Sequence, residues 1–129
     1  MRSPPRALAE QLAAAGERVD VLHANNVLAH VADLNGVVAG MRSMLKDTGV
    51  AVIEVPYVKE MLDRCEFDTI YHEHTSYLSL RAMEALLSQS ALRMVGAKHF
   101  QIHGGAVGIF LELNTPGRAP RLGDLSLLE

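Results

Sequence analysis

Apolar residues change their spacing along this 129-residue chain, and the spacing predicts the first three elements. Residues 5–15 have leucines four positions apart, after prolines that suit a first helical turn, so a helix is expected there. Residues 18–24 (RVDVLHA) alternate and then become apolar, which is typical of a strand with a buried face. Apolar residues at helical spacing predict a second helix over 33–46, with Asp33 as its N-cap.

The stretch 50–55 (VAVIEV) is the clearest strand, because it is short, apolar and rich in β-branched residues. The sequence Asp-Thr-Gly at 47–49 predicts the end of the preceding helix. A strand, a helix and a strand in succession favour a parallel sheet with helical crossovers. The same rules predict helices over 57–64 and 80–89, the second capped by Ser79, and strands over 92–97 and 106–113.

The composition narrows the class of protein. Hydrophobic residues make up 49% of the chain, which suits one soluble domain or a large part of one. The formal net charge of −3, without a Lys/Arg run, argues against nucleic acid and anionic membranes as partners. No apolar run approaches the roughly 20 residues that span a bilayer. The single Cys65 excludes an internal disulfide framework and a multi-cysteine zinc site, which fits a cytoplasmic protein.

The candidate chemistry is concentrated in residues 68–77 (DTIYHEHTSY), which hold two imidazoles, a carboxylate between them and two phenols. Buried His and Glu are costly unless they are paired and hydrogen-bonded, so this mixture is unusual for a core. One interpretation is a functional site. The other is a polar connection in which Tyr71 and Tyr77 pack inward and the remaining side chains are solvated.

Two further places suit a ligand. Asn25-Asn26 and Glu54 come at the carboxyl ends of two predicted strands, where open α/β sheets bind their ligands. The alternative is a simple turn and a solvated strand end. Gly104-Gly105 allows either a close approach to a ligand or a plain hairpin turn, and the pattern alone favours the hairpin.

Three motifs in this order resemble a known family. They are residues 20–34 (DVLHANNVLAHVADL), residues 71–79 (YHEHTSYLS) and residues 103–105 (HGG). They resemble the S-adenosylmethionine-dependent C-methyltransferases that act on keto-deoxysugar nucleotides, and the likeness covers most of residues 5–113. Such enzymes have an N-terminal zinc-binding module, a central Rossmann-like cofactor domain and a C-terminal sugar-nucleotide domain.

The resemblance implies an α/β fold, namely a partial Rossmann-like methyltransferase fold with a mostly parallel sheet and flanking helices. Residues 1–66 would be the second half of the cofactor domain. Residues 67–114 would start the sugar-nucleotide domain as a second α/β unit, and residues 115–129 would be a disordered tail. The zinc module and a Gly-x-Gly-x-x-Gly loop have no counterpart in this sequence, so zinc is expected only in the family's N-terminal module.

The activity implied by the resemblance is methyl transfer to a carbon beside a sugar ketone. A base must remove the α-proton, and imidazole suits this task near neutral pH. By resemblance, His74 is the base, Glu73 orients it, Tyr71 donates a hydrogen bond to the developing oxyanion, and His30 is a second imidazole of the site. Regular strand geometry separates Tyr71 and Glu73 from His74, so this stretch is expected to be irregular.

The resemblance also implies the ligand contacts. S-adenosylmethionine is the expected cofactor and a keto-sugar nucleotide the expected partner. The residues expected near the cofactor are Asn25 and Asn26, and those expected near the substrate are His103, Gly104 and Gly105.

Three alternatives stay open. The chain is a truncated, inactive or partner-dependent methyltransferase fragment, which associates with itself or complements an N-terminal half. Alternatively, His72 and His74, with His30 or His103, bind a divalent metal, since imidazole suits zinc, iron or copper. The third alternative is a binding or scaffold domain without chemistry.

Overall fold

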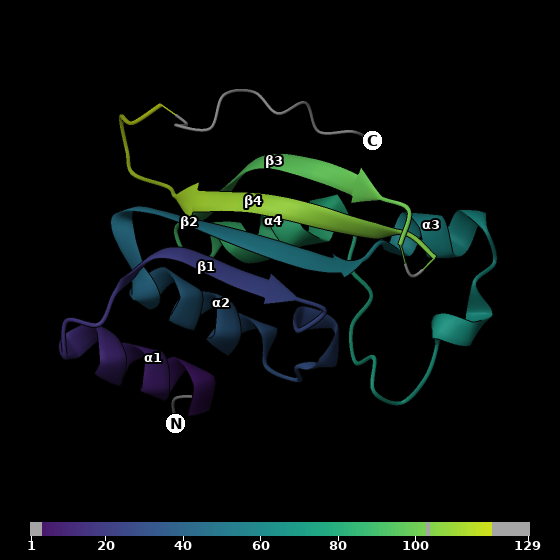
Figure 1. Ribbon diagram of the computed structural model, residues 1–129, viewed down its shortest axis with the longest axis horizontal. Helices are drawn as coiled ribbons and strands as arrows, with labels where there is room; N and C mark the ends of the chain where they lie inside the picture. Colours follow the sequence, from purple (N-terminus) through teal and green to yellow (C-terminus); the bar gives the residue numbers. More distant parts are fainter. Residues whose placement is uncertain (1–3, 103, 120–129) are drawn as a thin grey trace.

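A computed structural model describes residues 4–102 and 104–119 of the chain (Figure 1). In chain order, its elements are α1 (Pro4–Ala14), β1 (Val19–Asn25), η1 (Leu28–His30), α2 (Leu34–Met44), β2 (Leu45–Pro56), α3 (Val58–Asp63), η2 (Phe67–Thr69), α4 (Leu80–Ser88), β3 (Leu92–Phe100) and β4 (Ala106–Leu113). Within this part of the chain, no helix is long and apolar enough to cross a membrane.

The strands form one four-stranded sheet in the order β1-β2-β4-β3. The strands β1 and β2, joined through α2, are parallel, as the strand–helix–strand pattern predicts. The other two pairs, β2 with β4 and β3 with β4, are antiparallel. The predicted α/β class with flanking helices is confirmed, but the sheet is mixed rather than mostly parallel. The reason is the short connection between β3 and β4, because only antiparallel strands can be joined by a tight turn.

The sheet also combines strands that precede residue 66 with strands that follow it, although we expected one unit to end there and a second to begin. The strand β4 lies between β2 and β3, so strands from both sides of that position share one sheet and one core. At the far end, Arg93 Nη1 donates to the carbonyl oxygen of Arg118 (2.9 Å), and Arg118 Nη1 donates to that of Asp47 (3.0 Å). Arg118 is therefore hydrogen-bonded to residues of β3 and β2. The rest of the expected tail lies outside the described residues.

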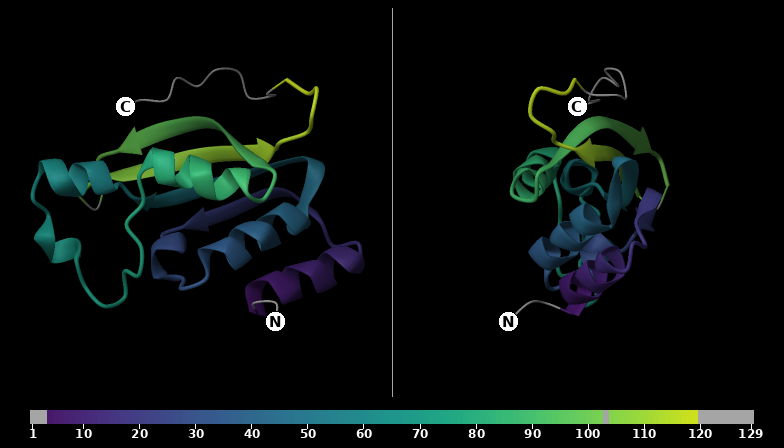
Figure 2. Two further views of the ribbon diagram at one scale, coloured as in Figure 1. Left: turned by 180° about the vertical axis from the view of Figure 1, so that it is seen from behind. Right: turned by 90° about the vertical axis from the view of Figure 1, so that its left-hand side faces the viewer.

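The core lies on one face of the sheet. Figure 2 shows α1, α2 and α4 on the same side of the strands. Alternate residues of the central strands point to this side, and Ile53 of β2 and Ile109 of β4, which are register partners, are fully buried. Val38 of α2 and Met83 of α4 are fully buried as well. Burial of each such side chain stabilises the fold by about 1.5–3 kcal/mol, so this layer supplies the rigid base of the molecule.

The predicted helix caps are confirmed. The Asp33 carboxylate accepts a hydrogen bond from the Gly36 amide (2.9 Å), and the Ser79 hydroxyl accepts one from the Ala82 amide (3.2 Å). The predicted stop at 47–49 differs, because β2 already begins at Leu45. Residues 46–49 form a bulge, since Val19 pairs with Leu45 while Val21 pairs with Val50. A long-range pairing with β1 therefore overrides the local stop signal.

Candidate active site

The turn at the carboxyl end of β1 forms one side of the site. Asn26 has a positive φ of 52°, and its amide donates to the carbonyl oxygen of Glu54 (2.9 Å). Asn tolerates this left-handed conformation better than most residues, so the chain can turn sharply here. The next residues form η1, which buries Leu28 and Ala29 and leaves His30 exposed. The sharp strand-to-loop turn predicted from Asn25-Asn26 is confirmed.

Residues 70–77 form the other side and contain neither helix nor strand. The His74 amide donates to the carbonyl oxygen of Tyr71 (3.0 Å), which folds the segment into a turn. The Tyr71 and His74 rings then lie on the same side of the segment, with centroids 4.2 Å apart. The irregularity that the sequence required is therefore present.

Two hydrogen bonds indicate the tautomer of the His74 ring. Its Nδ1 lies 2.8 Å from the carbonyl oxygen of Thr69, which can only accept, so Nδ1 carries the hydrogen. In the neutral ring, Nε2 then holds the lone pair, and the Tyr71 hydroxyl lies 3.0 Å from it. His74 is therefore oriented as a base whose free nitrogen faces a phenol.

His30 is held in the same way from the opposite side. Its Nδ1 donates to the main-chain oxygen of Glu73 at 2.9 Å, so its Nε2 is also the nitrogen with a lone pair. The His30 and His74 ring centroids are 4.9 Å apart, with the planes inclined by 51°. Two imidazoles from segments more than forty residues apart therefore lie side by side.

The two imidazole-bearing segments line a cleft of about 440 Å³. It is lined by Asn26, His30, Pro56, Asp68, Thr69, Tyr71 and His74. A second, much smaller cavity of about 10 Å³ lies against His74 and is bordered by Glu66, Ser76, Tyr77 and Gly105 among others. It has room for about one water molecule. Four residues expected from the sequence, namely Asn26, His30, Tyr71 and His74, thus share one cleft.

Two expected residues are placed differently. The Glu73 carboxylate lies 4.0 Å from His72 Nε2, with both side chains largely solvated. The group that orients His74 is the Thr69 carbonyl, and Glu73 contributes its main-chain oxygen to His30 instead. Asn25 pairs with Glu54 in the sheet and is not among the residues that line the cleft.

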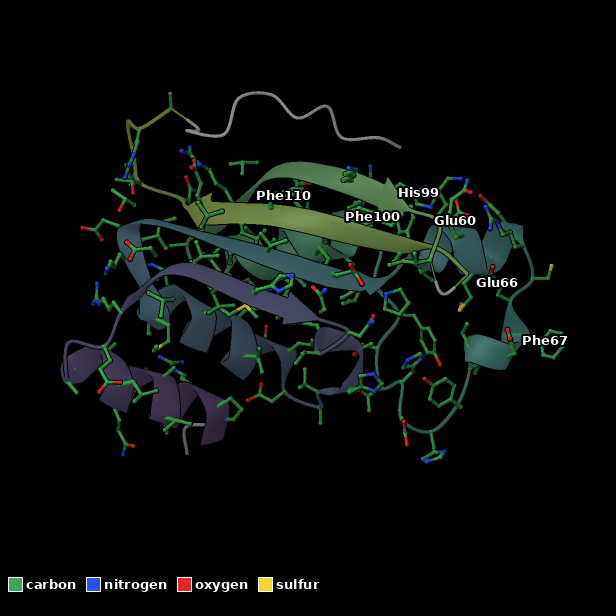
Figure 3. All side chains as sticks on the ribbon, in the orientation of Figure 1. Glu60, Glu66, Phe67, His99, Phe100 and Phe110 are labelled. Atoms are coloured by element: carbon green, nitrogen blue, oxygen red, sulfur yellow. The ribbon has the colours of Figure 1, made fainter. Side chains whose placement is uncertain are left out.

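The Gly104-Gly105 turn closes the β3–β4 hairpin, as the pattern favoured. Both glycines have positive φ, and the Gly105 oxygen accepts from the Tyr57 amide (3.0 Å). A Cβ added at Gly105 would lie 2.7 Å from the Cβ and Cγ of Glu60, and one at Gly104 would lie 2.5 Å from a carboxylate oxygen of Glu66. Figure 3 shows both glutamates at this end of the sheet. The glycines therefore let the turn pack against the segment around α3, while their contact with a substrate stays a prediction.

The metal site that the sequence allowed as an alternative concerns His72 and His74, with His30 or His103. In the part of the chain that the structure describes, no group of three or more His, Cys, Asp or Glu side chains could hold a metal ion. The His72 side chain is 91% exposed and is not among the residues that line the cleft containing His74. His103 lies outside the described residues.

Sequence reasoning missed three residues around His74. Thr69 orients the imidazole, and Asp68 and Pro56 line the cleft. Asp68 and Thr69 fall within the stretch 68–77 that drew attention to the site. However, a main-chain carbonyl carries no sequence signal, so Thr69 could only be found from the structure.

Comparison with known proteins identifies the family of the chain. A family model described as a methyltransferase domain matches residues 4–96. The chain belongs to this methyltransferase family. The match covers residues on both sides of position 66, and the sheet likewise contains strands from both sides.

Among proteins with assigned activities, the chain is similar to the C-methyltransferase NovU of Streptomyces niveus. The two are 34% identical over 101 residues, which cover 78% of this chain and 24% of NovU. The resemblance to C-methyltransferases seen in the sequence is thus confirmed. The chain spans about a quarter of the length of this relative.

Solved methyltransferase structures share the fold. A putative methyltransferase in complex with the Trm112 methyltransferase activator of Haloferax volcanii superposes with a TM-score of 0.62 at 11% identity, covering 80% of this chain and 57% of that one. Magnesium protoporphyrin IX methyltransferase (ChlM) of Synechocystis PCC 6803, solved with bound S-adenosylhomocysteine, gives a TM-score of 0.57 at 9% identity, covering 78% and 47%. At such low identity these structures establish the Rossmann-like methyltransferase fold alone.

Proposed function

We propose that this methyltransferase-family chain forms the acceptor side of an S-adenosylmethionine-dependent C-methyltransferase site. The proposed substrate is a keto-deoxysugar nucleotide, methylated at the carbon beside its ketone. The observation that carries the proposal is the orientation of His74 in the cleft, with Nδ1–H bonded to Thr69 and the Nε2 lone pair facing Tyr71. The similarity to a C-methyltransferase supports the reaction type.

The Tyr71–His74 pair supplies both groups that carbon methylation requires. His74 Nε2 takes the α-proton, and the electrons of that C–H bond form the enolate. The Tyr71 hydroxyl, displaced from Nε2 by the substrate, donates its hydrogen bond to the enolate oxygen. The enolate carbon would then bond to the methyl group, the electron pair of the broken S–C bond staying with S-adenosylhomocysteine as the leaving group. The proton would leave His74 to solvent.

The cleft suits a cationic methyl donor. S-adenosylmethionine, when bound, supplies an electrophilic methyl group on a positively charged sulfonium. The residues that line the cleft include Asp68 and Asn26 but neither Lys nor Arg. A negative and polar lining favours a cation over an anion at this position. We assign Asn26, at the carboxyl end of β1, to the cofactor side of the cleft, with Asn25 next to it.

A second candidate is a chain that acts only with a partner. The strand β1 pairs with β2 alone within the described sheet, so its outer edge is open to another strand. Val21 of β1 is 66% exposed on the face opposite the helices, beside Val50 of β2. A partner that carries the N-terminal half of a methyltransferase domain would extend the sheet at this edge and cover this face, and self-association through the same edge is the competing arrangement.

Hydrogen exchange at the substrate carbon tests the proposed base, because it requires deprotonation without methyl transfer. A keto-deoxysugar nucleotide is incubated with the protein in deuterated water, and loss of the α-proton signal is followed by NMR. His74→Ala is expected to lower the exchange rate by about 10²–10⁴-fold. His72→Ala, which removes a solvated imidazole two residues away, is expected to leave it near the wild-type value.

Equal rates in wild type and His74→Ala would overturn the assignment of the base. To separate the second candidate, S-adenosylhomocysteine is titrated calorimetrically into the chain alone and into its mixture with an N-terminal methyltransferase half. Binding that appears only in the mixture establishes partner dependence. Equal binding in both samples contradicts it.

A further inference from the structure

The two segments that carry the imidazoles are fastened to each other at one residue, Thr75. Its amide donates to the carbonyl oxygen of Ala29 (2.8 Å), and its hydroxyl lies 3.2 Å from that oxygen and 3.1 Å from the carbonyl oxygen of Val31. The bond from His30 Nδ1 to the oxygen of Glu73 crosses the same gap. We refer to these contacts between residues 29–31 and 73–75 as the clasp.

The clasp is needed because little apolar burial holds the second segment. Ile70, Tyr71 and Tyr77 are 61%, 43% and 37% exposed, and residues 70–77 form neither helix nor strand. Segments with few buried apolar contacts have low local stability. The position of residues 73–75 therefore depends on polar bonds rather than on the core.

Thr75 also lies next to both imidazole-bearing residues, through the chain on one side and through its hydrogen bond on the other. It directly follows His74, and its acceptor Ala29 directly precedes His30. A bond between Thr75 and Ala29 thus fixes the two imidazole-bearing residues beside each other, with ring centroids 4.9 Å apart. It also holds the Glu73 oxygen where it selects the Nδ1–H tautomer of His30.

We propose that Thr75 is a positioning residue whose hydroxyl holds the base-bearing segment against the loop that follows β1. This inference rests on the proposed function for its catalytic consequence, although the clasp itself is a statement about structure. Loss of the hydroxyl leaves the Thr75 amide bond to Ala29 but removes the bond to the Val31 carbonyl oxygen, so residues 73–75 can shift relative to 29–31. A displacement of about 1 Å in an active site lowers rates by about 10²-fold, so the effect falls on turnover rather than on overall folding.

The test compares Thr75→Val, which keeps the shape and removes the hydroxyl, with Thr75→Ser, which keeps the hydroxyl. Ser88→Ala is the control, because it removes a hydroxyl bonded to a main-chain carbonyl in α4 (2.9 Å). The first readout is the ¹⁵N NMR spectrum of the imidazoles. The wild type, Thr75→Ser and Ser88→Ala are expected to show Nδ1–H at His30 and His74, and Thr75→Val is expected to lose this preference at His30.

The second readout is the rate of α-hydrogen exchange. Thr75→Val is expected to lower kcat by about 10²-fold at nearly unchanged KM, and Thr75→Ser to restore it. Wild-type tautomers and rates in Thr75→Val would overturn the proposal. If the tautomers change in Thr75→Val but the wild type exchanges no α-proton, the clasp stands and the proposed function fails.

A measurement on the wild type covers the case in which Thr75→Val does not fold. Amide hydrogen exchange of Thr75 is expected to be slower than that of its neighbours in residues 70–77, because its N–H donates to Ala29. An unprotected Thr75 amide in the folded protein would contradict the clasp.

Discussion

The central strands and the segment 70–77 are built by opposite means. In β2 and β4, Ile53 and Ile109 are fully buried partners in a regular ladder. In the segment, Ile70 is 61% exposed, and the fixed positions come from hydrogen bonds to main-chain oxygens. The first region therefore owes its geometry to apolar burial and the second to polar bonds.

The difference separates stability from chemistry. A core-facing side chain of the central strands, such as Ile53, packs in the buried core, so its loss is felt by the whole fold. A side chain of the segment contributes little burial, so its loss is expected to alter the cleft while the fold persists. Substitutions in the central strands should thus lower stability, and substitutions in the segment 70–77 should lower activity without unfolding the protein.

The largest effect is expected from Ile53→Ala. Removal of a fully buried isoleucine leaves a cavity between the sheet and its helices and should lower the free energy of unfolding by about 2–5 kcal/mol. Chemical denaturation measures this loss. Val21→Ala, at a 66% exposed position of β1, is the control and should change stability by less than about 0.5 kcal/mol. Similar losses in both variants would break the distinction between core and exposed face.

Tyr71→Phe should lower the reaction rate and leave the stability of the fold nearly unchanged, the opposite of Ile53→Ala. The ring can still pack against His74, but the donor to the enolate oxygen is lost, so α-hydrogen exchange should fall by about 10²–10³-fold. The unfolding midpoint should stay near that of the wild type. Tyr77→Phe is the matched control. The Tyr77 ring lies edge-on to His74, with ring centroids 6.2 Å apart, so this substitution is expected to leave the rate unchanged. A full-rate Tyr71→Phe protein would exclude the phenol from the reaction.

Gly105 lies between the two regions, because it precedes β4 and borders the same small cavity as His74 and Tyr77. Gly105→Ala therefore tests how tightly this turn is packed. Its φ of +126° disfavours a side chain, and the new Cβ would meet Glu60 at 2.7 Å, so a loss of about 1–3 kcal/mol is expected. Gly16→Ala has a positive φ of 84° but open space around the added Cβ, and thermal unfolding of both variants isolates the contact with Glu60. If Glu60→Ala does not restore part of the stability of Gly105→Ala, the close packing is not the cause.

The smallest effect is expected from Glu73→Gln. The substitution keeps the main-chain oxygen that accepts from His30 and changes only a solvated carboxylate. The rate of α-hydrogen exchange should therefore remain near the wild-type value. A large loss would instead support the role that the sequence indicated for this carboxylate, in which it orients His74.

The local predictions succeeded where local forces decide. The β4 bounds, the Asp33 and Ser79 caps and the sharp turn at Asn26 depend on side-chain period, capping and backbone preference. The mixed sheet, the bulge over 46–49 and the continuity of the sheet past residue 66 depend on which strands pair, and pairing joins residues far apart in the chain. No local pattern contains that information.

The candidate site divides in the same way. The sequence by itself, through the family resemblance, indicated Tyr71, His74 and His30 as candidates for the chemistry. It also predicted that residues 70–77 are irregular, because a regular strand would place Tyr71 and His74 on opposite faces. Only the tertiary structure decided that the Thr69 carbonyl orients His74, that the Glu73 carboxylate faces solvent and that Thr75 joins the two segments. The physical reason is that main-chain carbonyls, which every residue possesses, become specific partners only once the fold has placed them.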